Sequence, residues 1–141
     1  MEEKIKHLEF VQNVITRMNS NSFQLKGWMI AILSALLALY ASSSKTLYIF
    51  VAIIPTLIFW LLDTYYLQQE RKFRGLYNDI AAGIIGTFEM PIDRYVYSRK
   101  NKESKKFFYW NVFFSKTIWP LYGLVVLGLG LGGVILIIVN K

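Results

Sequence analysis

The sequence contains no cysteine and only one histidine, and its nine acidic residues are scattered along the chain. A chain without cysteine forms neither disulfides nor a thiol-based catalytic site, and a lone histidine without clustered carboxylates offers no ligand set for a metal ion. His7 also lacks a neighbouring nucleophile, and we place it on the hydrophilic or flanking side of the first helix. The glycine-rich run 128–133 is not followed by the Lys-Ser/Thr pair that completes a phosphate loop. We therefore expect no catalytic residues, no metal, no cofactor and no enzymatic activity.

Long uncharged runs are abundant instead, in a chain that is 55% hydrophobic. The segments 27–41 and 47–62 carry no charge and are joined by the short turn Ser42–Lys45, and a third run, 118–139, holds 22 uncharged residues. A bilayer is crossed by about 20 apolar residues in a helix, a length that the third run reaches and that the first two approach with their flanking residues. The sequence therefore predicts an all-α membrane protein with three transmembrane helices.

Positive charge is concentrated on one side of these runs. Ten of the 16 basic residues lie between the second and third runs, namely Arg71, Lys72, Arg74, Arg94, Arg99, Lys100, Lys102, Lys105, Lys106 and Lys116. The turn between the first two runs carries only Lys45, and the tail carries only Lys141. Because basic loops stay in the cytoplasm, we expect the N-terminus inside and the C-terminus outside.

The expected organisation has four segments. A cytoplasmic amphipathic helix, 1–26, precedes a transmembrane hairpin, 27–66, and a basic, aromatic-rich cytoplasmic loop with a helical extension, 67–116, precedes the third transmembrane helix, 117–141. The start of the chain mixes acidic and basic residues and lacks the pattern of a cleaved secretory signal. The first span is therefore expected to stay in the mature protein.

The first helix and the first span present two patterns that each allow two interpretations. Leu8, Val11, Ile15 and Met18 form a heptad-like face, which either packs on the rest of the chain or mediates self-association. Small and polar residues form the second pattern, a stripe at three- and four-residue spacing: Asn13, Arg17, Gln24, Gly27, Ala31, Ser34 and Ala38. Small residues allow close helix approach in lipid, so this stripe either packs against the second span or lines a narrow aqueous path.

The second span contains Pro55, which is expected to kink it, with Thr56 re-satisfying a backbone carbonyl. Asp63 follows at the cytoplasmic end, beside Tyr65 and Tyr66, whose rings are typical of the membrane interface. We interpret Asp63 as a cap or an ion-pair partner, with a functional carboxylate as the alternative.

The loop is expected to begin as a helical continuation over 68–80 and to pass through an extended stretch, 92–97, and a basic loop, 98–106. The aromatic segment 107–114, which includes Trp110, directly precedes Trp119 and the third span. This composition is typical of an interfacial helix, and although basic and aromatic residues also occur together at nucleic-acid sites, we expect lipid and no nucleic acid. In the third span Gly128 and Gly132 match the small-xxx-small packing motif.

The stretch 7–18, with Asn21-Ser22-Phe23, Lys26-Gly27-Trp28, the segment 59–63 and Gln69-Glu70-Arg71, resembles a group of small bacterial inner-membrane proteins of unassigned function. The resemblance covers roughly the first 80 residues. It implies a similar N-terminal helix followed by two spans. Families of this size and layout often include membrane effectors of bacterial antiviral systems, which is an analogy of layout only.

Two functions follow as hypotheses. One is a homo-oligomeric pore or membrane-perturbing effector in the bacterial cytoplasmic membrane, because a 16.4 kDa chain with three helices cannot enclose a path alone. The other is a non-conducting membrane platform whose basic loop recruits or restrains a cytoplasmic protein partner.

Overall fold

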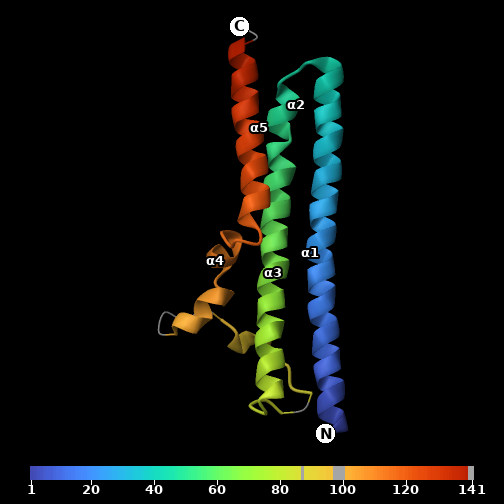
Figure 1. Cartoon of the computed structure of the whole chain (residues 1–141), viewed down its shortest axis with the longest axis vertical. Helices are drawn as coiled ribbons and strands as arrows, with labels where there is room; N and C mark the ends of the chain where they lie inside the picture. Colours follow the sequence, from blue (N-terminus) through green and yellow to red (C-terminus); the bar gives the residue numbers. More distant parts are fainter. Residues whose placement is uncertain (87, 97–100, 140–141) are drawn as a thin grey trace. The chain divides into compact units, whose positions relative to one another are not determined.

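The computed structural model describes residues 1–86, 88–96 and 101–139, and all the regular structure in these ranges is helical (Figure 1). The elements are α1 (Glu2–Ser43), α2 (Leu47–Val51), α3 (Ile53–Ala81), the 3-10 turns η1 (Ile92–Arg94) and η2 (Lys102–Phe107), α4 (Tyr109–Phe113) and α5 (Trp119–Val139). Three helical segments, namely α1, α2 continued by α3, and α5, are long and apolar enough to cross a membrane. The prediction of an all-α chain with three such helices is confirmed.

The chain forms two compact units, each made of segments that are distant in sequence. The spanning unit contains residues 23–63 and 113–141, and the loop unit contains residues 1–22 and 64–112. The N-terminal leader and the first span belong to one uninterrupted helix, α1, so this helix contributes to both units, as does α3.

In the spanning unit, serine side chains end α1 and form the hairpin turn. Ser44 adopts a positive φ of 55° and its N–H donates to the carbonyl of Tyr40 at 2.7 Å, which is the left-handed residue that commonly closes a helix. The hydroxyls of Ser42 and Ser43 both donate to the carbonyl of Leu39, at 3.0 and 2.7 Å. The carbonyls of Leu39 and Tyr40 near the end of α1 thus accept local donors, and the chain reverses within three residues, 44–46.

The second span is interrupted where Pro55 requires it. A proline lacks the N–H that would donate four residues back and clashes with that carbonyl, and α2 indeed ends at Val51, four residues before Pro55. The hydroxyl of the buried Thr56 donates to the carbonyl of Ala52 at 2.9 Å. The expected interruption is confirmed, but the hydroxyl of Thr56 bonds the carbonyl of Ala52 and not that of Val51, which is the carbonyl that Pro55 leaves without its usual donor.

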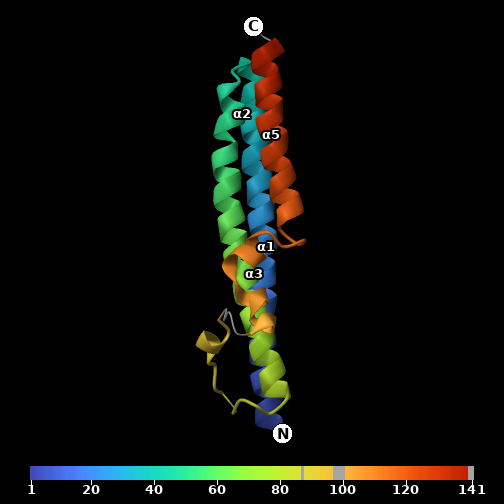
Figure 2. The same cartoon turned by 90° about the vertical axis from the view of Figure 1, so that its left-hand side faces the viewer.

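The three apolar segments of the spanning unit lie side by side, as Figures 1 and 2 show for the C-terminal half of α1, for α2 with the start of α3, and for α5. Ile49, Ala52 and Leu129 form the buried core, against which large side chains of α1 pack: Leu33, Leu36 and Tyr40. The small residues of α1 take no part in this core and are exposed. The interpretation that the small stripe packs against the second span is wrong, because the larger side chains of α1 fill that space.

The loop unit packs the start of α1 on the end of α3 and on the segment that follows it. Its core consists of Val11, Ile15, Leu76, Ile80, Ile85, Tyr95 and Phe107. The heptad-like face of the first helix therefore packs within its own chain. The helical continuation after the second span is also confirmed, since α3 runs to Ala81 and its Glu70 bonds Arg74 at 2.8 Å.

The extended stretch predicted over 92–97 is wrong where the structure describes it. Residues 92–94 form the 3-10 turn η1, in which the N–H of Arg94 donates to the carbonyl of Pro91 at 3.1 Å. The restricted φ of proline favours such a turn over a strand. The basic loop expected over 98–106 instead contains η2 from Lys102 onward, and residues 97–100 of these two expected segments lie outside the described residues.

Helix packing in the spanning unit makes Gly133 sensitive to substitution. A Cβ added at Gly133 would lie 2.7 Å from the ring of Phe50, whereas a Cβ added at Gly130 would meet nothing within 4 Å. We expect Gly133→Ala to be less stable than Gly130→Ala by about 2 kcal/mol, because the first overpacks a helix contact and the second only gains helix propensity. Unfolding in mixed detergent micelles measures the difference. Equal stabilities would contradict the contact between Phe50 and α5.

Candidate functional site

A buried charge cluster joins the three apolar segments of the spanning unit at one end. The side chain of Asp63, on α3, is fully buried, and its Oδ2 atom lies 2.5 Å from Nζ of Lys26 on α1. The same oxygen accepts the hydroxyl of Tyr122, on α5, at 3.0 Å. We call these three residues the clamp. One carboxylate oxygen thus binds a side chain from each of the other two segments.

Separating the charged groups of the clamp inside the protein costs free energy. Removing a carboxylate and an ammonium from water costs several kcal/mol for each ion, and only close pairing with further hydrogen bonds offsets this cost. Lys26 keeps 23% of its side chain exposed, whereas Asp63 keeps none, so the ion pair is removed from water mainly at its carboxylate. Of the two interpretations of Asp63 made from the sequence, the geometry favours an ion-pair partner.

Aromatic rings surround the clamp. The indole of Trp60, one turn before Asp63, stacks on Phe113 with ring centroids 4.1 Å apart and on the ring of Tyr122 at 6.0 Å. Its Nε1 atom donates to the carbonyl of Phe113 at 3.2 Å. Trp60 therefore satisfies its polar atom internally, and the flat stack restricts water around the ion pair on this side.

The other aromatic residues expected at the membrane interface are more exposed. Tyr65 is exposed and contacts Tyr66 edge to face, with centroids 5.8 Å apart. Trp110 and Trp119 are also exposed, at 54% and 43%. Exposed rings of this kind are suited to the headgroup level of a bilayer.

The polar and small stripe of α1 is exposed along its whole length. Every member is solvent-accessible in the single chain: Asn13, Arg17, Gln24, Gly27, Ala31, Ser34 and Ala38. At 3.6 residues per turn these positions lie roughly opposite the face that carries Leu25, Met29 and Leu36. We call this surface the open face of α1. The hydroxyl of Ser34 donates to the carbonyl of Ile30 at 2.8 Å, so the helix itself satisfies that donor.

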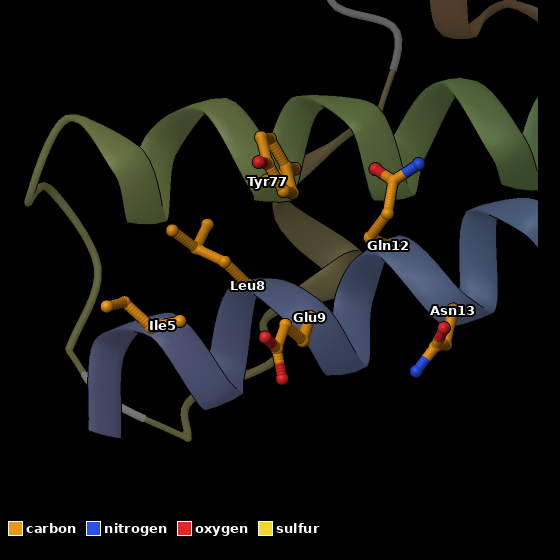
Figure 3. Close-up of a pocket in the computed structure, with 6 residues that line it drawn as sticks. All are labelled: Ile5, Leu8, Glu9, Gln12, Asn13 and Tyr77. Carbon is orange, nitrogen blue, oxygen red and sulfur yellow. The ribbon is translucent and has the colours of Figure 1, made fainter. Parts of the chain in front are cut away.

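The direction of the open face can be followed at Asn13. A shallow groove of about 400 Å³ runs between α1 and α3 in the loop unit, lined by Ile5, Leu8, Glu9, Gln12, Asn13 and Tyr77. Figure 3 shows Leu8 and Gln12 directed toward α3 and Tyr77, whereas Asn13 points away from that helix. The groove is lined mainly by apolar carbon and carries one carboxylate, Glu9. Asn13 belongs to the surface that faces away from the chain's own packing.

Of the two glycines expected to pack the third span, Gly128 is exposed and Gly132 is partly exposed, and an added Cβ would meet nothing within 4 Å at either. The close approach within the chain uses Gly133 instead, where Phe50 lies against the backbone. The motif 128–132 thus leaves a second small-residue surface unoccupied by the chain itself, and its role in association between copies stays a prediction.

His7 was placed on the wrong side of its helix by sequence reasoning. It is buried, with 1% exposed, and its Nδ1 accepts the backbone N–H of Phe88 at 3.1 Å. Phe88 has a positive φ of 64° and stacks on the imidazole with centroids 5.7 Å apart. His7 therefore binds the segment after α3. Residues 7, 11, 14 and 18 share one face of a helix, so this spacing in the sequence could have placed His7 on the packed face.

Comparisons with protein-family models, with curated proteins and with solved structures find no match for the chain. The geometry of the clamp and of the open face therefore carries the functional argument.

A double substitution tests the clamp. We expect Lys26→Met to lower the free energy of unfolding by about 3 kcal/mol because it leaves the buried carboxylate of Asp63 without its counter-ion. Adding Asp63→Leu should restore part of this stability because it removes the unpaired charge, although the buried hydroxyl of Tyr122 then lacks its acceptor.

The matched control is Lys6→Gln, which breaks the exposed pair with Glu2 and should cost less than about 1 kcal/mol. Unfolding in detergent compares all four proteins. A double variant that is no more stable than Lys26→Met would mean that Lys26 and Asp63 do not act as a pair.

Proposed function

We propose that the chain forms a homo-oligomeric pore or membrane-perturbing assembly in the bacterial cytoplasmic membrane, with the open face of α1 at the contact between copies. The observation that carries this proposal is the division of α1 into two faces. Leu33 and Leu36 pack inside the spanning unit, whereas Gly27, Ala31, Ser34 and Ala38 are left exposed. Such small residues, spaced three and four apart, favour close contact with another helix in lipid, where large side chains gain nothing from leaving the acyl chains.

The orientation of the chain in this proposal is N-terminus inside and C-terminus outside. Two observations support it. Lys26 at the start of the first span and Tyr122 near the start of the third contact the same residue, Asp63, so these two spans run in the same direction. The loop that carries ten basic residues follows Asp63, and basic loops stay in the cytoplasm.

In an assembly built on the open face, the polar residues of α1 face a shared axis. Asn13, Arg17 and Gln24 continue the spacing of the small residues toward the N-terminus and are exposed. A ring of Arg17 side chains at the cytoplasmic mouth would favour anions. Several copies are required, because the three segments of one chain pack on each other and enclose no path.

Association through the open face is tested by adding bulk to it. We expect Ala31→Leu combined with Ala38→Leu to lower the number of copies in the detergent-purified assembly, because leucine keeps the helices apart. Light scattering coupled to size exclusion measures the copy number. The control Val134→Leu enlarges an exposed side chain of α5 and should leave the assembly unchanged. A wild-type monomer in mild detergent and in nanodiscs would favour the alternative of a non-conducting platform for a cytoplasmic partner.

Conduction is tested in planar bilayers with the wild type and Arg17→Glu. We expect anion preference in the wild type and a shift toward cations in the variant, because the substitution reverses the sign of the ring. Lys45→Glu, in the turn at the other end of α1, serves as the matched charge reversal. Conductance with the same ion preference in the wild type and in Arg17→Glu would remove the first helix from the path, leaving the glycine-rich α5 as the better lining.

A further inference from the structure

The backbone of the short basic turn η2, in the loop unit, is held in place by hydrogen bonds from side chains. The turn η2 presents three successive carbonyls, of Lys105, Lys106 and Phe107, each of which accepts a side-chain donor. Asn111 donates to the first at 3.1 Å, Arg71 to the second at 3.2 Å and Gln68 to the third at 2.8 Å. Arg71 and Gln68 belong to α3, so the turn is fastened directly to the long helix.

The underside of the turn is also anchored. Phe107 is buried, with 8% exposed, and meets the ring of Tyr95 edge to face at 5.6 Å. Tyr95 donates to Asp79 on α3 at 2.6 Å, and burial together with this hydrogen bond to a carboxylate raises the pKa of its phenol. The phenol therefore stays a neutral donor at physiological pH. Gly75 leaves room for both rings, since a Cβ there would lie 2.8 Å from Tyr95.

The outer side of the turn carries the charge. Lys102, Lys105 and Lys106 are exposed, and none of the ion pairs among the residues that the structure describes involves them. Glu103 is the one acidic residue within the turn. A net positive surface is therefore held by the hydrogen-bonded turn; Nζ of Lys106 lies over the ring of Phe107, 5.1 Å from its centroid, while its side chain stays exposed.

Trp110 gives this surface an apolar component. It lies in α4, which the hydrogen bond of Asn111 joins to the turn, and it is 54% exposed. Trp110 also precedes the start of α5 at Trp119 by nine residues, so the chain alone keeps it within about 30 Å of a candidate span. Exposed lysines and an exposed indole within the segment 102–110, which the chain joins to a candidate membrane span, match the headgroup region of an anionic bilayer in both charge and polarity.

We infer that the exposed side chains of Lys102, Lys105, Lys106 and Trp110 bind anionic phospholipid, which lies in the cytoplasmic leaflet if the chain has the orientation proposed above. The lysines contact lipid phosphates and the indole of Trp110 enters the interface between headgroups and acyl chains. This role does not depend on conduction or on the number of copies. It concerns the loop unit alone.

The test measures which lipid surrounds Trp110. Replacing Trp28, Trp60 and Trp119 by phenylalanine leaves Trp110 as the only indole in the full chain. The protein is placed in vesicles of equimolar phosphatidylglycerol and phosphatidylcholine, with brominated acyl chains on one lipid or on the other. We expect brominated phosphatidylglycerol to quench Trp110 fluorescence at least about twofold more strongly, since each lysine near the surface enriches anionic lipid about fivefold.

The preference should disappear in the variant Lys102→Gln/Lys105→Gln/Lys106→Gln and in 1 M salt, and persist in the matched control Lys45→Gln. Equal quenching by the two lipids in the parent, as expected if the lysines served an acidic protein instead, would overturn the inference. Quenching that keeps its preference in the triple variant would also overturn it. Should the tryptophan replacements disturb folding, native mass spectrometry of the otherwise wild-type chain, counting anionic lipids retained with and without the three lysines, gives an independent decision.

Discussion

The spanning unit depends on one carboxylate oxygen. Asp63 is fully buried, and Lys26 and Tyr122 both stabilise its charge there. Because a helix advances about 1.5 Å per residue, sliding any of the three segments by a single residue would separate these groups. The clamp therefore sets the register of the segments at one end. Trp60, stacked over the same cluster, ties the segment before α5 to that register.

The two faces of α1 carry different side chains because one packs against the chain and the other is exposed. Toward the chain, large side chains such as Leu36 and Met29 fill the space between segments, as in any helical core. Away from the chain, Gly27 and Ala31 leave the backbone within reach of a neighbour. In water the outward face would carry charge. In lipid no such demand exists, and close backbone approach becomes the main source of attraction between helices.

Several features were readable from local chemistry alone. The uncharged runs predict the long helices, Pro55 predicts the interruption at Ala52, and the four-residue spacing of Glu70 and Arg74 predicts their ion pair. Features that arise from the meeting of distant segments were not readable. The partner of Asp63 depends on how α1 lies against α3, and the role of Gly133 depends on which side chain faces it. The prediction for His7 is wrong for another reason: its polarity favours a hydrophilic face, but its helical spacing places it on the packed face.

The three-residue turn between α1 and α2 has a consequence for how the protein is made. In the proposed orientation, the segment that crosses to the far side of the bilayer is only Ser44, Lys45 and Thr46, with a single charge. The hydroxyls of Ser42 and Ser43 are already bonded to the carbonyl of Leu39, so these two donors need no water. Two helices joined in this way can enter the bilayer together as a paired hairpin, because only the three residues of the turn have to cross it.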